Sequence, residues 1–126
     1  MIALDTSSLV HYLAGSTGKD VDAVDAALAH SQACLPAVVL SEVLSDPKLP
    51  QKLERALLQI PVLPLKAGYW ERAGRLRALA ISKGHKAKLA DALIAQACLD
   101  HEVPLVTRDP DFRHFRAAGL RVLPTG

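Results

Sequence analysis

The feature that most constrains the fold of this chain is the alternation of short apolar runs with longer segments of helical periodicity. Four runs have the length and composition of buried strands, at residues 2–4, 33–35, 103–107 and 120–123. Strands that alternate with helices along a chain form a parallel sheet with helices on both faces. The sequence therefore predicts an α/β fold, a three-layer α/β/α sandwich with a mainly parallel central sheet.

The helices between these runs are predicted from apolar spacing and from helix breakers. The strongest helical pattern is at residues 87–100, where apolar side chains recur at i and i+4. Asp20 is predicted to be the N-cap of the second helix. Residues 61–65 are bounded by prolines and are predicted to form a short edge strand. Helices are expected from Thr6, at 20–31, 37–45, 49–60, 66–82 and 87–100, and through Phe115.

The size and composition of the chain are those of one ordinary globular domain, residues 1–126, because it has 126 residues and is 50% hydrophobic. Cys34 and Cys98 lie far apart in apolar surroundings, so no disulfide framework is expected. The start has no basic leader, and no apolar run approaches the roughly 20 residues that a membrane span needs. We therefore expect no membrane partner and a cytoplasmic location.

Four acidic residues interrupt otherwise apolar segments: Asp5, Glu42, Asp91 and Asp109. An ionised carboxylate near a core is costly unless it is paired, hydrogen-bonded or bound to a metal. Few basic residues accompany these acids, which indicates a cation. Mg²⁺ and Mn²⁺ bind carboxylate oxygens together with waters and phosphate oxygens, so the expected chemistry is phosphodiester hydrolysis by an activated water.

Each acid also has a structural explanation that the sequence leaves open. Asp5 follows a strand and could cap the next helix. Glu42 could lie on a solvated helix face. Asp109 and Asp111 flank a proline in a turn, where Asp is common. Asp91 lies beyond the first turn of its helix among apolar neighbours, so function is the better explanation there.

The segments MIALDTSSLVHYL, SEVLSD, KLADALIAQACLDHEVPLVTRDPDF and LRVL, in this order, resemble a PIN domain over the whole chain. The resemblance implies a PIN-like, Rossmann-like fold and a Mg²⁺- or Mn²⁺-dependent ribonuclease. The acids of that family match Asp5, Glu42, Asp91 and Asp109, and its metal ligands match Asp5, Asp91 and Asp109. Asp111 could share or replace the role of Asp109, because the spacing of the last acid varies in the family.

The resemblance also implies that the hydroxyls of Thr6, Ser7 or Thr107 orient the carboxylates or bound water. A single-stranded or looped RNA substrate is implied as well. The net charge of +2 does not itself indicate nucleic acid, but a basic segment after Glu71 is a candidate phosphate-contacting surface, with a solvated helix face as the alternative. The predicted RNA-contacting residues are Arg72, Arg75, Lys83, Lys86, Lys88 and Arg108.

Only five aromatic residues occur, too few to predict a base-stacking platform, and most are expected in the core. They are Tyr12, Tyr69, Trp70, Phe112 and Phe115.

The pattern is closest to the toxin of a VapBC-type toxin–antitoxin pair, which implies a VapB-type antitoxin and a homodimer. Apolar residues around Leu40, Leu44, Leu53 and Leu57 are the candidate surfaces for these partners. Two alternatives stay open: a stand-alone PIN nuclease in RNA processing, and a catalytically silent module that binds RNA or protein. A phosphoaspartyl hydrolase is disfavoured because it needs a second Asp at the position of Ser7.

Overall fold

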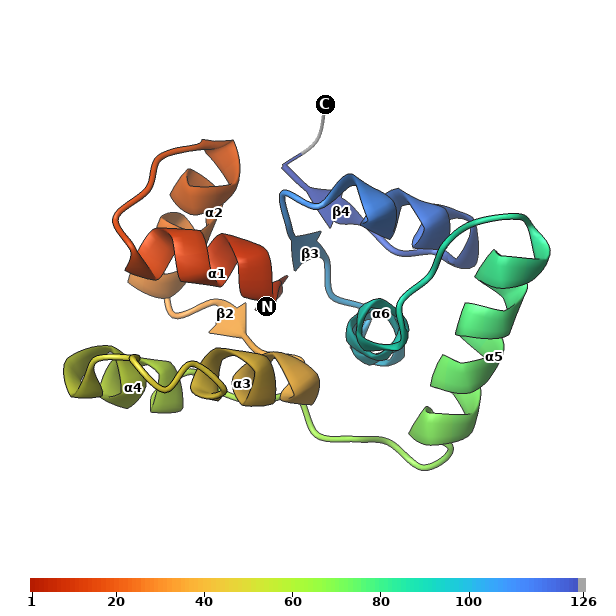
Figure 1. Cartoon of the computed structure of the whole chain (residues 1–126), viewed down its shortest axis with the longest axis horizontal. Helices are drawn as coiled ribbons and strands as arrows, with labels where there is room; N and C mark the ends of the chain where they lie inside the picture. The colour runs from red at the N-terminus through yellow and green to blue at the C-terminus, as the bar shows by residue number, and fades with distance from the viewer. Residues whose placement is uncertain (125–126) are drawn as a thin grey trace.

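Four short strands form the centre of the computed structural model, which describes residues 1–124 (Figure 1). They are β1 (Ile2–Leu4), β2 (Ala33–Cys34), β3 (Leu105–Val106) and β4 (Val122–Leu123). All neighbours are parallel and the order is β2-β1-β3-β4, so β1 and β3 are the central strands. The carboxyl ends of β1 and β3 therefore meet at one edge of the sheet.

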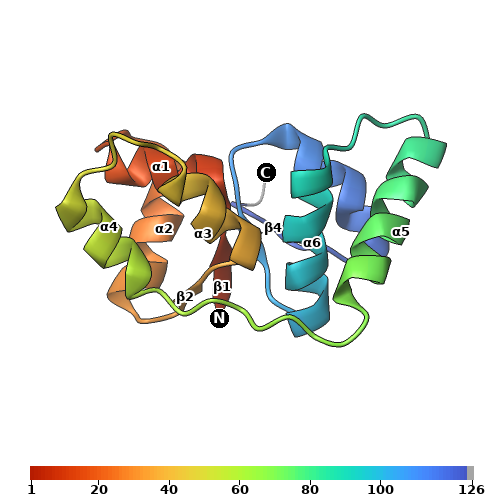
Figure 2. The ribbon, with the colours of Figure 1, turned by 60° about the horizontal axis from the view of Figure 1, so that its bottom comes forward.

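The helices cover both faces of this sheet. Helices α1 and α2 lie on one side, and α6 lies on the other with α5 outside it (Figures 1 and 2). This arrangement confirms the α/β fold with helices on both faces of a parallel sheet. The helices are α1 (Thr6–Leu13), α2 (Lys19–Ala29), α3 (Ala37–Leu44), α4 (Gln51–Leu58), α5 (Tyr69–Ser82), α6 (Leu89–His101) and the 3₁₀ helix η1 (Pro110–Ala118).

The core explains why the strands are apolar without alternation. Leu4, Leu105 and Val106 are fully buried, since helices cover both faces of the central strands. Six of the seven residues from Ala92 to Cys98 in α6 are buried, because this helix passes between the sheet and α5. None of the helices in the described part of the chain is long and apolar enough to cross a membrane.

Three local predictions were wrong. Gly18, and not Asp20, is the N-cap of α2. Residues 61–65 form a single bridge, between Val62 and Leu35, because the prolines that bound this segment have no N–H for a strand ladder. Helix α5 begins only at Tyr69, since Gly68 has a left-handed φ of 81° that ends the preceding loop.

Two side chains also lie elsewhere than predicted. Leu57 was a candidate for a partner surface, but it is only 1% exposed and packs in the core, since it lies on the inward face of α4. Trp70 is one of the aromatic residues of which most were expected in the core, but it is 63% exposed. Its neighbour Tyr69 takes the buried position and donates a hydrogen bond to the Leu93 carbonyl (2.6 Å). The prediction that most of the aromatic residues are buried is confirmed by Tyr69, Phe112 and Phe115.

Candidate active site

Asp5 follows the last residue of β1 and lies at the sheet edge where β1 and β3 end. Its N–H donates to the carbonyl of Val106 at 2.9 Å, which fixes its backbone to the end of β3. Although Asp5 is the N-cap residue of α1, its carboxylate makes no capping hydrogen bond in the described structure. Helix capping therefore does not account for a carboxylate that is only 4% exposed.

Two hydroxyl groups hold the Asp5 carboxylate. Ser7 Oγ and Thr107 Oγ1 donate hydrogen bonds to the same oxygen, Asp5 Oδ2, at 2.8 and 2.7 Å. Burial nevertheless raises the pKa of Asp5 above its usual value, more than these hydrogen bonds lower it. Both hydroxyls thus hold one oxygen of this buried carboxylate, Oδ2.

Asp91 lies in the first turn of α6, and not beyond the first turn as predicted, because this helix begins at Leu89 and not at residue 87. The charges of Asp109 and Asp5 act on it. The pKa of Asp91 is raised to about 6, most by burial and then by the nearby charges of Asp109 and Asp5, with Asp111 adding a smaller effect. Lys88 lowers it but does not offset these effects. The structure thus brings four predicted acids from three segments to one place, where their charges repel each other.

The loop after β3 connects these acids. The N–H of Asp109 donates to Thr107 Oγ1 (3.0 Å), the same hydroxyl that donates to Asp5. Asp109 Oδ1 in turn accepts the N–H of Asp111 at 2.9 Å and caps η1. Asp109 is partly buried whereas Asp111 is exposed, so Asp109 lies deeper at the site.

Glu42 lies at the rim of this cluster. It is exposed on α3, which contacts α1, and its Oε1 accepts a hydrogen bond from Thr6 Oγ1 at 2.7 Å. Thr6 therefore faces Glu42, whereas Ser7 and Thr107 face Asp5. The charge of Asp109, in contrast, raises the pKa of both Asp5 and Asp91.

The donor set fits a hard divalent cation. In residues 1–124 no three His, Cys, Asp or Glu side chains are arranged to enclose a metal ion. Mg²⁺, however, binds through one or two carboxylates and keeps several waters, and Mn²⁺ prefers the same ligand types. Asp5 and Asp91 form no ion pair in the described part of the chain and raise each other's cost of ionisation. A cation at these oxygens would compensate that charge.

The model of the PIN domain family matches residues 2–118, a range that contains every acid described above. The chain belongs to the PIN domain family. PIN domains are generally nucleases. No curated protein sequence matched the chain significantly.

Solved structures with a similar fold include the following three. FitAcB from Neisseria gonorrhoeae is 23% identical, with 97% of this chain and 96% of that chain covered and a TM-score of 0.69. VapBC2 from Rickettsia felis, bound to a DNA fragment from its promoter, is 21% identical over 97% of both chains, with a TM-score of 0.73. VapBC-5 from Mycobacterium tuberculosis is 18% identical over 98% of both chains, with a TM-score of 0.68. These likenesses show that this PIN domain shares their fold.

The basic residues of this PIN domain are not equally free. Arg72 forms a bidentate ion pair with Asp100, with Nη2 and Oδ2 2.6 Å apart. Arg108 is paired in the same way with Asp20. Both arginines were predicted to contact RNA, but each guanidinium group is already paired with a carboxylate of the chain. Of the predicted RNA-contacting residues, Arg75, Lys83, Lys86 and Lys88 are exposed, and the charge of Lys88 lowers the pKa of Asp91.

Two features near the acids were missed by the sequence. Asp20 is buried against Arg108, 88 residues away, and no local pattern indicates such a pair. His85 and His114 stack with ring centroids 4.0 Å apart, and His114 Nε2 lies 3.9 Å from Asp111 Oδ1. The stack joins the loop between α5 and α6 to η1.

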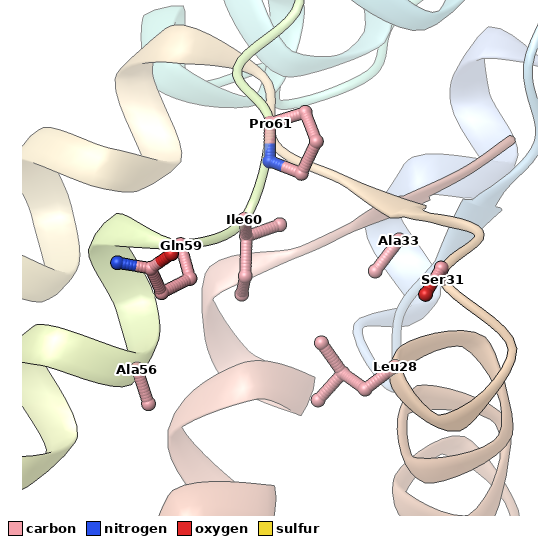
Figure 3. Close-up of a pocket in the computed structure, with 7 residues that line it drawn as sticks. All are labelled: Leu28, Ser31, Ala33, Ala56, Gln59, Ile60 and Pro61. Carbon is pink, nitrogen blue, oxygen red and sulfur yellow. The ribbon is translucent and has the colours of Figure 1, made fainter.

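A separate cavity of about 320 Å³ lies at the opposite edge of the sheet, where β2 begins (Figure 3). It is lined by uncharged residues, among them Leu28, Ala33, Ala56 and Pro61. Because it has no ionisable lining residue, it offers no chemistry comparable with the acidic site. The acids therefore mark the candidate active site of this PIN domain.

Proposed function

We propose that this chain is an endoribonuclease that depends on Mg²⁺ or Mn²⁺ and hydrolyses RNA phosphodiester bonds with an activated water. The observation that carries the proposal is the meeting of Asp5, Asp91 and Asp109 at the carboxyl ends of β1 and β3. Their uncompensated charge favours a divalent cation over a purely structural role. Ligands of open parallel sheets bind at this edge.

Different residues of the site would have different roles in the reaction. Asp5 and Asp91 would hold the cation, with Asp109 as a further oxygen ligand. A bound Mg²⁺ or Mn²⁺ would polarise the scissile phosphate and lower the pKa of the attacking water. Ser7 and Thr107 keep the Asp5 carboxylate in one orientation through its Oδ2. Glu42, held by Thr6 at the rim, would orient water or RNA entering the site.

Exposed lysines support RNA as the substrate. Lys83, Lys86 and Lys88 lie in the short segment between α5 and the start of α6, and Lys88 is next to the acids. Lysine ammonium groups in such a position bind backbone phosphates without reading sequence. We propose that this segment holds single-stranded RNA across the acidic site.

The biological role that fits best is that of a toxin with an antitoxin partner. Its support is the fold shared with the VapBC and FitAcB structures. A groove of about 450 Å³ is lined by Glu42 and by apolar residues of α1, of α4 and of the segment before α4, including Val10, Leu13 and Leu53. We propose that Leu53 contacts the antitoxin and that Leu40 and Leu44, on α3, contact the antitoxin or a second copy.

Leu44→Asp and Leu53→Asp test these surfaces. Because a carboxylate in an apolar contact must be desolvated, each variant should weaken dimer formation or antitoxin binding at least tenfold, measured by sedimentation and by calorimetry. Unchanged mass and affinity in both variants would reject these surfaces. That result would leave the proposed ribonuclease activity untouched, because it is tested separately.

RNA cleavage itself is tested with labelled single-stranded RNA. The wild-type chain should cleave it in Mg²⁺ or Mn²⁺ and should stop when EDTA is added. Asp5→Asn and Asp91→Asn should lose this activity while staying folded, and Asp22→Asn, an exposed acid on α2, is the matched control that should keep it. Full activity in either site variant would reject the site. A folded wild-type chain without any cleavage would favour a silent binding module.

A further inference from the structure

A second layer of charge supports the loop that follows β3. Arg108 lies between Thr107 and Asp109, the two residues that connect this loop to Asp5. Its guanidinium donates hydrogen bonds to both carboxylate oxygens of Asp20, from Nε to Oδ2 at 2.8 Å and from Nη2 to Oδ1 at 3.1 Å. The Arg108 side chain is thus paired with α2, whereas its backbone is part of the acidic loop.

We propose that Asp20 and Arg108 are a positioning pair that holds the Thr107–Asp109 loop, and with it the Asp5 carboxylate, in the geometry needed for cleavage. The inference rests on the proposed ribonuclease function. It gives Arg108 a role through the loop and not through RNA. Neither side chain touches the substrate in this account.

The pair is built into the fold on the side of α2. Asp20 lies in the first turn of α2, where the helix dipole favours an anion, and its side chain is only 8% exposed. Helix α2 packs against β3, the strand that leads into the loop. Burial raises the pKa of Asp20, but the hydrogen bonds and charge of Arg108, together with Ser8 and the Val21 backbone, more than offset this, so the net pKa is below its usual value. The carboxylate is therefore ionised and fixed at neutral pH.

Gly18 is a second, independent observation, because the absence of a side chain there leaves space for the Asp20–Arg108 pair. It has a φ of 148°, and a Cβ there would lie 2.7 Å from Asp20 Oδ1 and 3.3 Å from Arg108 Nη2. A side chain at position 18 would force Asp20 Oδ1 to shift and would crowd Arg108 Nη2. Gly15 also has a positive φ, 77°, but a Cβ there would meet no atom within 4 Å.

The test measures cleavage by three variants of the pair: Asp20→Asn, Arg108→Gln and the double variant that carries both substitutions. Each is compared with a control variant, Asp100→Asn. Asp100→Asn is the matched control, because it breaks the other bidentate Arg–Asp pair, which joins α5 to α6 and touches none of the acidic loop. If Asp20 and Arg108 act as one unit, either single variant and the double variant should lower kcat by about the same factor, roughly 10- to 100-fold for a misplaced group. KM for RNA should change less than twofold, and Asp100→Asn should keep kcat.

A merely structural role is separated by amide hydrogen exchange on the metal-free chain. The Asp109 amide, which donates to Thr107 Oγ1, should exchange at least tenfold faster in Asp20→Asn and Gly18→Ala, and at the wild-type rate in Asp100→Asn and Gly15→Ala. An unchanged Asp109 amide in Asp20→Asn would overturn the proposal. So would a raised KM with unchanged kcat in Arg108→Gln alone, which would make Arg108 an RNA contact. If the wild type cleaves no RNA, the proposed function fails, and the exchange rates still decide whether the pair holds the loop.

Discussion

Replacing Asp91 by Asn should make the metal-free protein more stable at neutral pH, although it removes a residue of the proposed active site. The reason is the electrostatic cost of the wild-type carboxylate. Asp91 is partly buried, and Asp109 and Asp5 repel its charge. Asn keeps the size of the side chain and removes the charge.

The size of the effect follows from the pKa. A rise from 3.8 to about 6 corresponds to about 3 kcal/mol at roughly 1.4 kcal/mol per pKa unit. Because Asp91 is partly open to solvent, screening reduces this value, and we expect Asp91→Asn to gain about 1–2 kcal/mol of unfolding free energy.

The pH dependence of stability shows in which direction Asp91 changes the free energy of unfolding. Between pH 3.8 and about 6 the folded state holds a proton on Asp91 that the unfolded state has lost, so the stability of the wild type falls as the pH rises through this window. The stability of Asp91→Asn should not show this fall between pH 3.8 and about 6. Its advantage should therefore be full at pH 7.5 and nearly absent at pH 4.

The assay is denaturant unfolding in EDTA at both pH values, with Asp22→Asn as the exposed control. Equal or lower stability of Asp91→Asn at pH 7.5 would refute the electrostatic reasoning. Adding Mn²⁺ should stabilise the wild type more than Asp91→Asn, since a ligand stabilises the state that binds it.

Two further predictions concern the surroundings of the site and the core. Thr107→Val removes the donor to Asp5 and the acceptor for the Asp109 N–H, so it should cost about 1–3 kcal/mol of stability and at least tenfold in cleavage rate, whereas Thr107→Ser should keep most of both. Leu57→Ala should cost about 2–5 kcal/mol in denaturant unfolding and leave cleavage by the remaining folded protein unchanged, because Leu57 packs in the core and is not one of the residues of the acidic site. A cost below 1 kcal/mol would contradict its core position.

Much of the fold follows from local patterns. The strands at Ile2–Leu4 and Ala33–Cys34 lie within the predicted apolar runs, and α6 follows its i, i+4 repeat. The errors have non-local causes. A stripe of leucines predicts an amphipathic helix but does not say which of its residues meets the core, and this is why Leu57 was misplaced.

The candidate site could be predicted in part for the same reason. Asp5 and Asp109 stand where parallel strands end, so their meeting follows from topology, and Asp91 was recognised by its apolar neighbours. The partners of the arginines could not be predicted. Arg108 binds a carboxylate 88 residues away and Arg72 one 28 residues away, and such pairs depend on how helices pack and not on any spacing in the sequence.

The measurement that tests the account most directly is a crystal structure with Mn²⁺, in which anomalous scattering locates the metal. The account predicts Mn²⁺ bound at the carboxylates of Asp5 and Asp91, on the side toward Asp109, and no such peak in crystals of Asp91→Asn. A protein that cleaves RNA in Mn²⁺ but binds the metal away from these acids, or does not bind it there at saturating concentration, would contradict the central claim.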